Sequence, residues 1–252
     1  MTDLFLKAVT IDRDKLETFG ASSDDRYLLR LPVTRHLHRL EFSSPVTFLA
    51  GENGTGKSTL IEAIAVACGF NAEGGSRNFD FATRRSHSAL CRCLEIERGR
   101  RRPRDGFFLR AESFYNLATN IEELDRQPAA SRKIIESYGG KSLHEMSHGE
   151  SFFTLMTHRF GTDGLYILDE PEAALSPSRT MAMLTLMHEL CAGGAQFIIS
   201  THSPILLAYP GAVIYELSED GIRTVSYRET GSYQTMKQFL DNPERMVRYL
   251  TE

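Results

Sequence analysis

A glycine-rich segment near residue 50 constrains the fold more than any other part of the sequence. It reads Gly51-Glu-Asn-Gly-Thr-Gly-Lys-Ser58 and fits the pattern G-x-x-x-x-G-K-[ST] of phosphate-binding loops. An apolar run at residues 46–50 precedes it, and a helix-favouring stretch at residues 59–67 follows it. Strand, glycine loop and helix in this order predict a nucleotide site, because the loop N–H groups and the helix dipole both attract phosphate oxygens. The alternative interpretation is a glycine-rich turn with a purely structural role.

The side chains of this loop predict its ligands. Lys57 would neutralise the β- and γ-phosphates of ATP, and the Ser58 hydroxyl would ligate Mg²⁺. The residues that we expect to contact the nucleotide are Asn53, Gly54, Thr55, Gly56, Lys57, Ser58 and Thr59.

A second apolar strand, at residues 165–168, ends in two acids, Asp169 and Glu170. Ligands of parallel sheets bind at the carboxyl ends of the strands, so these acids are expected beside the glycine loop. Asp169 would then hold Mg²⁺, largely through water, and Glu170 would be the general base for the attacking water. The alternative is a strand that merely ends in solvated acids.

Composition places the chain among ordinary folded proteins. Hydrophobic residues make up 41% and charged residues 25% of the 252 residues, which excludes a disordered chain. The sequence has no apolar window of about 18 residues and no signal-peptide pattern, so we expect a cytoplasmic protein without a membrane span. Its four cysteines lack C-x2-C spacing, which favours reduced thiols over a zinc site. The net charge of −4 argues against DNA binding over the whole surface.

The order of strand-like and helix-like segments predicts an α/β fold. We expect one domain over residues 1–252, with a P-loop core on a mainly parallel sheet, an antiparallel β portion from the N-terminal half, and a helical subdomain at about 110–160. A strand is expected at residues 89–97, with Cys91 and Cys93 on one side of it. Residues 213–217 and 222–227 predict a hairpin, and residues 233–250 predict a helical tail interrupted at Pro243.

Two further motifs flank the strand that ends in Asp169 and Glu170. Met146-Ser-His-Gly-Glu150 precedes it, and Ser200-Thr-His-Ser-Pro204 follows it. Together with the glycine loop and the two acids, they give residues 27–210 a resemblance to the ABC-type ATPase family. The resemblance implies ATP and Mg²⁺ as cofactors and a homodimer that sandwiches two ATP molecules. It also implies that His202 contacts the γ-phosphate and that Ser147, Gly149 and Glu150 cap the nucleotide of the other chain.

The departures from the family pattern point to one branch. Transporter ATPases usually read Leu-Ser-Gly-Gly-Gln where this chain has His148 and Glu150, and the Gln loop is missing, with Glu112 as its counterpart. The Asp-Glu-Pro-Glu continuation looks more like the RecF, SMC and OLD branch. Ser58 and Ser147 are 147 − 58 = 89 residues apart, which leaves no room for a long coiled coil. We therefore expect a stand-alone head without a nuclease domain.

Three functions follow from this resemblance. The first is ATP hydrolysis that drives conformational change in a DNA-maintenance or anti-phage defence complex, with a separate effector or nuclease subunit. The second is the nucleotide-binding subunit of an ABC transporter. The third is an ATP-gated dimerising module whose dimer state is itself the signal.

Several other side chains have a functional and a structural interpretation. The run Arg98-Gly-Arg-Arg-Arg-Pro-Arg104 is expected to be a solvated hairpin tip, with DNA contact as the alternative. Tyr27 is expected in the core, with stacking on adenine as the alternative. His36 and His38 alternate on an expected strand and are expected to be exposed polar positions, with metal binding as the alternative, for which no third ligand is evident. Arg110 is either structural or directed at the γ-phosphate.

Overall fold

The computed structural model describes most of the chain. The described residues are 3–20, 25–76, 89–112, 114, 118–119, 121–122, 125, 135–136, 140 and 146–252. Nearly half of the predicted helical subdomain at about 110–160, chiefly between residues 113 and 145, lies outside them. The single-domain boundary therefore stays a prediction. No helix of the described part is long and apolar enough to cross a membrane.

The central sheet is mainly parallel, as predicted. Its strand order is β5-β6-β7-β3-β8-β9, and only β9 runs antiparallel to its neighbour. In this order the strands are Asp105–Arg110, Gly164–Asp169, Gln196–Ser200, Val46–Gly51, Val213–Ser218 and Gly221–Val225. The register places Asp169 opposite both Arg110 of β5 and Ser200 of β7. Three functional strand ends therefore lie side by side at one edge.

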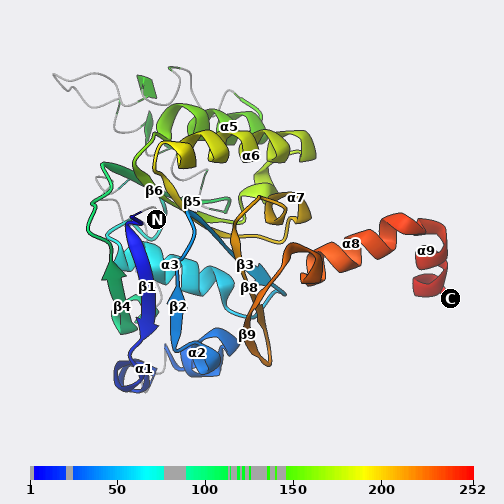
Figure 1. The fold of residues 1–252 in the computed structure, drawn as a ribbon, viewed down its shortest axis with the longest axis horizontal. Helices are drawn as coiled ribbons and strands as arrows, with labels where there is room; N and C mark the ends of the chain where they lie inside the picture. Colours follow the sequence, from blue (N-terminus) through cyan, green and yellow to red (C-terminus); the bar gives the residue numbers. More distant parts are fainter. Residues whose placement is uncertain are drawn as a thin grey trace.

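Alternate residues of these strands supply two separate cores, because side chains alternate between the faces of a strand. In β3, Val46, Phe48 and Ala50 belong to one cluster and Leu49 to the other. The first face is covered by α5 (His148–Arg159), α6 (Pro177–Ala192) and α7 (Pro204–Leu207). The second face is covered by α3 (Lys57–Ala67), as Figure 1 shows.

A three-stranded antiparallel sheet closes the layer beyond α3, which confirms the predicted antiparallel portion. It has the order β2-β1-β4, formed by Arg39–Glu41, Leu6–Ile11 and Leu94–Arg98. The remaining N-terminal elements are α1 (Arg13–Gly20), the 3-10 turn η1 (Arg26–Arg30) and α2 (Pro32–His36). Side chains from β1, α2 and α3 share one buried cluster. The helix that follows the glycine loop is thus held between two sheets.

Some local predictions are wrong. Residues 89–97 begin with a 3-10 turn, η2 (Ala89–Cys93), so Cys91 and Cys93 are not strand neighbours. His36 ends helix α2, which starts at Pro32 because proline suits the first turn of a helix, and His38 follows it before β2. The arginine run is not a hairpin tip, since it connects β4 of the outer sheet to β5 of the central sheet.

The C-terminal predictions are confirmed. Strands β8 and β9 form the antiparallel hairpin. After the short turn η6 (Tyr227–Glu229), the tail forms α8 (Gly231–Asp241) and α9 (Pro243–Thr251). The break falls at Pro243, which lacks the N–H that a continuous helix needs. Figure 1 shows both helices projecting away from the body.

Candidate nucleotide-binding site

The glycine loop wraps around the amine of Lys57. Gly54 and Gly56 have φ angles of 83° and 95°, a region that favours glycine. A Cβ at Gly56 would also lie 2.5 Å from Cγ1 of Val33, so this loop packs directly against α2. Lys57 is only 4% exposed, and its Nζ donates to the carbonyl oxygen of Glu52 at 2.8 Å. Burial lowers the pKa of Lys57, while the nearby carboxylates of Glu170 and Asp169 oppose that shift.

Ser58 and Asp169 meet across 111 positions of sequence. The Ser58 Oγ donates to Oδ1 of Asp169 at 3.2 Å. Asp169 is 6% exposed, and burial raises its pKa to about 6 against the opposing positive charge of Arg110. A cation placed here would meet a hydroxyl and a carboxylate, the hard oxygen donors that Mg²⁺ prefers.

The Ser58 hydroxyl and the Asp169 carboxylate are therefore suitable ligands for a Mg²⁺ ion bound together with nucleotide phosphates. The described residues hold no cluster of three or more His, Cys, Asp or Glu that could bind a metal by themselves. Mg²⁺ usually keeps several waters and takes further oxygens from phosphates, so one carboxylate and one hydroxyl are a sufficient protein share. Ser58 and Asp169 would hold the ion, which would neutralise phosphate charge when bound.

Glu170 and His202 form the second pair at this edge. The His202 Nε2 lies 3.4 Å from Oε1 of Glu170, and both side chains are about one-third exposed, at 35% and 38%. Glu170 has φ 49° and ψ 53°, a left-handed conformation that non-glycine residues rarely adopt. This backbone turn takes Glu170 out of the direction of β6, while its N–H still donates to the Ser200 carbonyl oxygen at 3.0 Å.

Glu172 organises the loop that carries His202, a contact that the sequence analysis missed. Its Oε1 accepts from the Thr201 hydroxyl at 2.6 Å and from the N–H groups of His202 and Ser203 at 2.6 and 3.1 Å. Glu172 lies in the 3-10 turn η5 (Pro171–Ala174), two residues after Glu170. Glu172, the last residue of the Asp-Glu-Pro-Glu string, was visible in the sequence, but nothing in the sequence indicated that it binds the backbone of His202, 30 residues away.

Arg110, rather than Glu112, lies beside the acidic site. The Glu112 side chain is 90% exposed, and its carboxylate is 3.8 Å from Arg110. Arg110 is 19% exposed, with Nη1 2.6 Å from Oε2 of Glu62 and Nε 3.6 Å from Oδ2 of Asp169. The end of β5 therefore presents a partly buried cation to the carboxylate at the end of β6. The structural interpretation of Arg110 holds, and its direction toward the γ-phosphate stays open.

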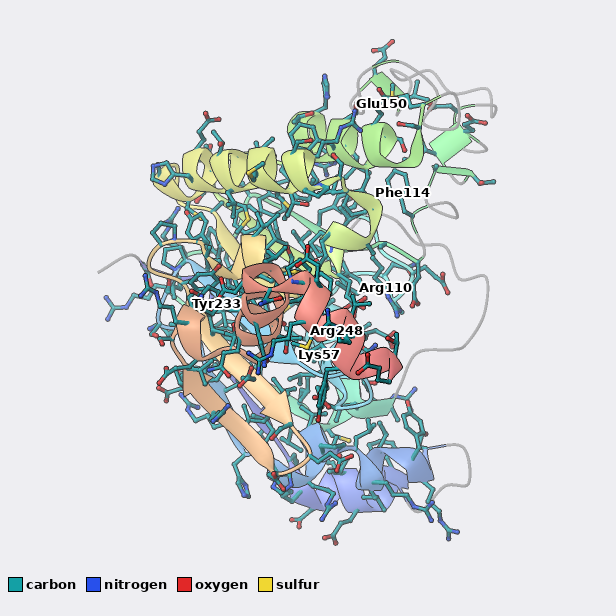
Figure 2. The ribbon with its side chains drawn as sticks, turned by 90° about the vertical axis from the view of Figure 1, so that its right-hand side faces the viewer. Lys57, Arg110, Phe114, Glu150, Tyr233 and Arg248 are labelled. Carbon is teal, nitrogen blue, oxygen red and sulfur yellow. The ribbon has the colours of Figure 1, made fainter. Side chains whose placement is uncertain are left out.

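The Ser147 motif forms the start of a separate helix. Ser147 is the N-cap of α5, and its hydroxyl and N–H both donate to Oε2 of Glu150, at 2.8 and 3.2 Å. Glu150 also lies 3.4 Å from Nη2 of Arg179. A Cβ at Gly149 would come within 2.8 Å of the Ala174 carbonyl oxygen, so the glycine permits close packing on η5. Figure 2 shows Glu150 well apart from Lys57, so this motif does not lie over the chain's own glycine loop.

Tyr27 is not in the core. It is 45% exposed and lies in η1, just before α2, the helix that touches the glycine loop through Val33. The core-packing prediction is wrong because η1 buries Leu28 instead, and the neighbouring tyrosine points outward. Stacking on adenine stays a prediction.

Two side chains of the arginine run form ion pairs with the body of the protein. Arg101 pairs with Asp163 and lies over the Phe5 ring at 5.1 Å, and Arg104 is 3.3 Å from the same Asp163 carboxylate. Arg98, Arg100, Arg102 and Arg104 are exposed. The run therefore keeps exposed positive charge, and DNA contact stays a prediction.

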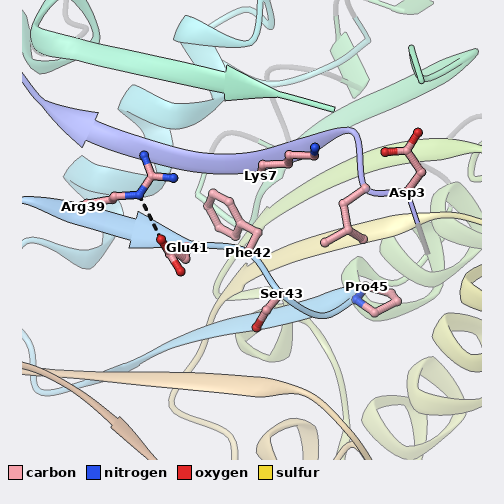
Figure 3. A pocket seen from close by; sticks show the side chains of 8 residues that line it. Asp3, Lys7, Arg39, Glu41, Phe42, Ser43 and Pro45 are labelled. Atoms are coloured by element: carbon pink, nitrogen blue, oxygen red, sulfur yellow. Dashed lines mark hydrogen bonds and ion pairs between the residues drawn. The ribbon is translucent and has the colours of Figure 1, made fainter. Parts of the chain in front are cut away.

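A cavity of about 720 Å³ adjoins the glycine loop. Its wall includes Glu52, His202, Arg223, Met236 and Phe239, so it extends from the glycine loop and the His202 loop along α8. Another cavity, of about 480 Å³, lies beside β1 and β2 and is lined by residues such as Lys7, Arg39 and Phe42 (Figure 3). None of the predicted site residues lines that second cavity.

Comparison with known proteins gives two family matches. A model described as an AAA domain matches residues 32–147. A second, described as an AAA domain, putative AbiEii toxin of a type IV TA system, matches residues 100–208. Together they extend from α2 to α7 and include every predicted site residue.

Among curated proteins, the chain is similar to the cobalt import ATP-binding protein CbiO of Salmonella typhimurium. The two are 26% identical over 208 residues, which is 77% of this chain and 74% of that protein. The corresponding protein of Salmonella typhi is 26% identical over 206 residues, 76% and 74% of the two chains.

Among solved structures, an inward-facing putative metal-chelate type ABC transporter is similar with a TM-score of 0.46 and 16% identity. The match covers 79% of this chain and 80% of that one. The SMC head domain from Thermotoga maritima is similar with a TM-score of 0.41 and 18% identity, over 75% of this chain and 92% of that one.

Proposed function

We propose that the chain is an ABC-type P-loop ATPase of the RecF- and SMC-like group and that it carries out Mg²⁺-dependent ATP hydrolysis at composite sites of a head-to-tail dimer. The two AAA-domain matches support the ATPase part of this proposal. The observation that carries the proposal is the meeting of three strand ends. The Ser58 Oγ lies 3.2 Å from Asp169, and His202 lies 3.4 Å from Glu170. These contacts support a phosphate site, a metal site and a general base that would lie together at one edge of the sheet.

Each residue has a role that follows from its position. Lys57 and the loop N–H groups would bind and orient the phosphates, with Lys57 exchanging the Glu52 carbonyl oxygen for a phosphate oxygen. Glu170 would accept the proton of the attacking water. His202 would contact the γ-phosphate and orient Glu170, from which its Nε2 lies 3.4 Å away. Mg²⁺, when bound, would supply charge neutralisation at the transferred phosphoryl group.

The dimer follows from the separation between the two halves of the site. Ser147, Gly149 and Glu150 lie at the N-terminus of α5, which can bind an anion but does not face this chain's own glycine loop. A second copy, turned head to tail, would present them to the γ-phosphate. Ser147 would then exchange the Glu150 carboxylate for a phosphate oxygen.

We place this ATPase in a DNA-maintenance or anti-phage defence complex with a separate effector. The description of the second family model, a putative AbiEii toxin, supports a defence role. The exposed arginines between β4 and β5 offer a surface for nucleic-acid phosphates. The similarity to the cobalt import proteins favours a second candidate, the ATP-binding subunit of a transporter. Against it stand the missing Gln loop and Glu150, which replaces the glutamine of the usual transporter signature.

Two variants test the hydrolytic dimer. Glu170→Gln should bind ATP but lose about 10²- to 10⁴-fold in turnover, the usual contribution of a general base. Near-normal phosphate release by this variant would remove Glu170 from that role. Ser147→Arg should bind ATP normally yet form no ATP-dependent dimer in light scattering. A Ser147→Arg protein that still dimerises would refute the composite site, and Lys57→Ala, which should not bind ATP, is the control.

A further inference from the structure

The C-terminal arm, defined here as α8 and α9, packs little against its own chain. Neither helix contains a buried residue. Six of its large apolar side chains are exposed, and they are Met236, Phe239, Leu240, Val247, Tyr249 and Leu250. Helices of this length are marginal in water without tertiary packing, because nucleation is costly. The arm is therefore built to be covered by something else.

The apolar side chains form stripes at helical spacing. In α8, Met236, Phe239 and Leu240 follow an i, i+3, i+4 pattern. In α9, Met246, Tyr249 and Leu250 follow the same pattern. The polar positions carry local pairs such as Lys237 with Asp241. Each helix thus has one face suited to an apolar partner and another suited to water.

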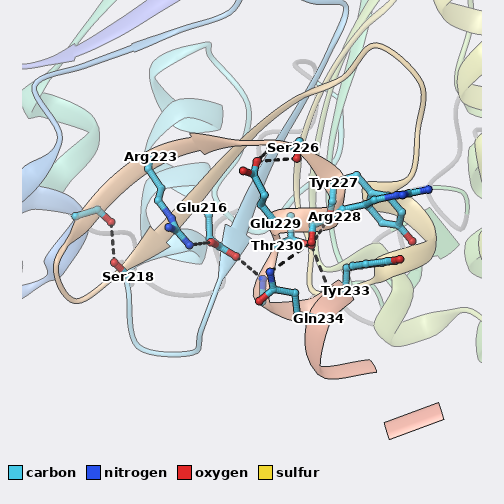
Figure 4. A network of polar contacts seen from close by, with 12 residues as sticks. Glu216, Ser218, Arg223, Ser226, Tyr227, Arg228, Glu229, Thr230, Tyr233 and Gln234 are labelled. Carbon is cyan, nitrogen blue, oxygen red and sulfur yellow. Dashed lines mark hydrogen bonds and ion pairs between the residues drawn. The ribbon is translucent and has the colours of Figure 1, made fainter. Parts of the chain in front are cut away.

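The root of the arm is fixed by a polar network (Figure 4). The Glu216 side chain accepts from the N–H of Gly231 at 2.7 Å and from Arg223 at 2.7 Å. Thr230 caps α8 by accepting from the N–H of Tyr233 at 3.3 Å. The Tyr227 and Tyr233 rings lie 4.7 Å apart between centroids. The direction in which the arm leaves the body is therefore set by the sequence.

The bend between the helices is also encoded. Asn242 has φ −159° and ψ 77°, and its side chain accepts from the N–H of Arg245 at 3.0 Å to cap α9. Pro243 occupies the first position of α9. The capped bend at Asn242 and Pro243 therefore fixes the angle between α8 and α9, and with it the relative orientation of their apolar faces.

The position of the arm identifies what covers it. Met236 and Phe239 share a cavity wall with Glu52 of the glycine loop and with His202. From there the arm projects outward, away from the body in Figure 1 and in front of it in Figure 2. A second copy that closes over ATP bound at the glycine loop would therefore come beside this root. The arm would thus extend the dimer interface, continuous with the nucleotide site.

We propose that the C-terminal arm clasps a second copy of this chain when two ATP-bound heads close. The inference rests on the proposed head-to-tail dimer and deepens it. Because the dimer is symmetric, each chain would contribute one arm. The apolar stripes would be buried against the partner in the closed state and exposed in the open state, so that loss of ATP releases them.

The test uses the full chain with Glu170→Gln, which holds ATP without turnover. In light scattering with Mg²⁺ and ATP, this parent should be dimeric. Adding Leu240→Glu and Leu250→Glu should weaken the dimer at least about 10-fold, with ATP affinity unchanged within about twofold, since buried charges are costly. Tyr249→Ser, at a side chain that is 82% exposed, should weaken it in the same direction without endangering the fold of the monomer.

A control is His188→Glu. His188 is exposed in the last turns of α6, away from both the arm and the Ser147 motif, so its change should leave the dimer intact. A dimeric parent whose arm variants dimerise equally well would overturn the arm's role alone and leave the composite site standing. A parent that stays monomeric with ATP, together with a Ser147→Arg variant that behaves identically, would overturn both the dimer and the clasp.

Discussion

Replacing Glu172 with alanine should uncouple ATP binding from hydrolysis. One carboxylate oxygen accepts three hydrogen bonds from the loop that carries His202, at 2.6, 2.6 and 3.1 Å. The Ser203 N–H has an alternative acceptor in the Thr201 hydroxyl at 3.0 Å, so two donors, on Thr201 and His202, lose their partner. Leaving a buried donor unpaired costs about 1 to 3 kcal/mol. The loop should therefore lose about 2 to 6 kcal/mol of local order.

Part of the lost stability of the His202 loop should lower kcat for ATP hydrolysis. If about 2 to 3 kcal/mol is needed to return His202 to its position, kcat falls about 30- to 150-fold, at about 1.4 kcal/mol per factor of ten. Lys57 and the glycine loop do not contact Glu172 in these bonds, so ATP affinity should change by less than about threefold. Phosphate release and binding of a fluorescent ATP analogue measure the two quantities.

Two matched variants sharpen the experiment. Glu172→Gln keeps one acceptor oxygen but loses the charge, so its rate should lie between those of the alanine variant and the wild type. Glu189→Ala removes an exposed glutamate of α6 and should change neither quantity. If Glu172→Ala hydrolyses ATP at the rate of the Glu189 control, the argument that Glu172 positions the His202 loop is wrong.

Two further outcomes are expected at Asp169 and its neighbour. Arg110→Gln should cost about 1.5 to 3 kcal/mol of stability by breaking the partly buried pair with Glu62, and should change the Mg²⁺ concentration needed for ATP binding. Arg159→Gln, which breaks the Asp105 pair at the other end of β5, should lower stability without the Mg²⁺ effect, and identical Mg²⁺ curves would refute the distinction. Burial raises the Asp169 pKa from 3.8 to about 6, so without nucleotide this carboxyl stabilises the folded state below pH 4 and that contribution is lost as pH rises through 6. Urea unfolding should show wild type losing about 2 to 3 kcal/mol relative to Asp169→Asn between pH 4 and 7, and parallel curves would contradict the assignment.

The parts of the fold that were predictable from sequence are those with a local physical cause. The apolar run ending at Ala50 and the glycines after it dictate a strand and a loop whatever the rest of the chain does. Pro243 likewise dictates a break between α8 and α9. The strand ending at Asp169 predicts an acid at the sheet edge because parallel strands share their carboxyl ends.

The parts that were missed depend on contacts between distant segments. Arg110 lies at the end of its own strand like many surface arginines, and only the register of β5 against β6 places it beside Asp169. The apolar alternation near Cys91 suggests a strand, but those side chains pack as a turn under α3. Spacing along the chain carries no information about which strands are neighbours, so these contacts could not be read from it.

The same long-range contacts link the two halves of the proposed composite site within one chain. Gly149, at the start of α5, packs so closely on Ala174 that an added Cβ would lie 2.8 Å from its carbonyl oxygen. Ala174 belongs to η5, and Glu172 of that same turn holds the backbone of His202. His202 in turn lies 3.4 Å from Glu170. Because packed contacts of this kind do not deform continuously, a displacement of the α5 N-terminus must be absorbed by η5 and therefore by the His202 loop. The N-terminus of α5, which would cap the nucleotide of a partner chain, is thus connected through packed contacts to Glu170, the proposed base for the nucleotide of its own chain.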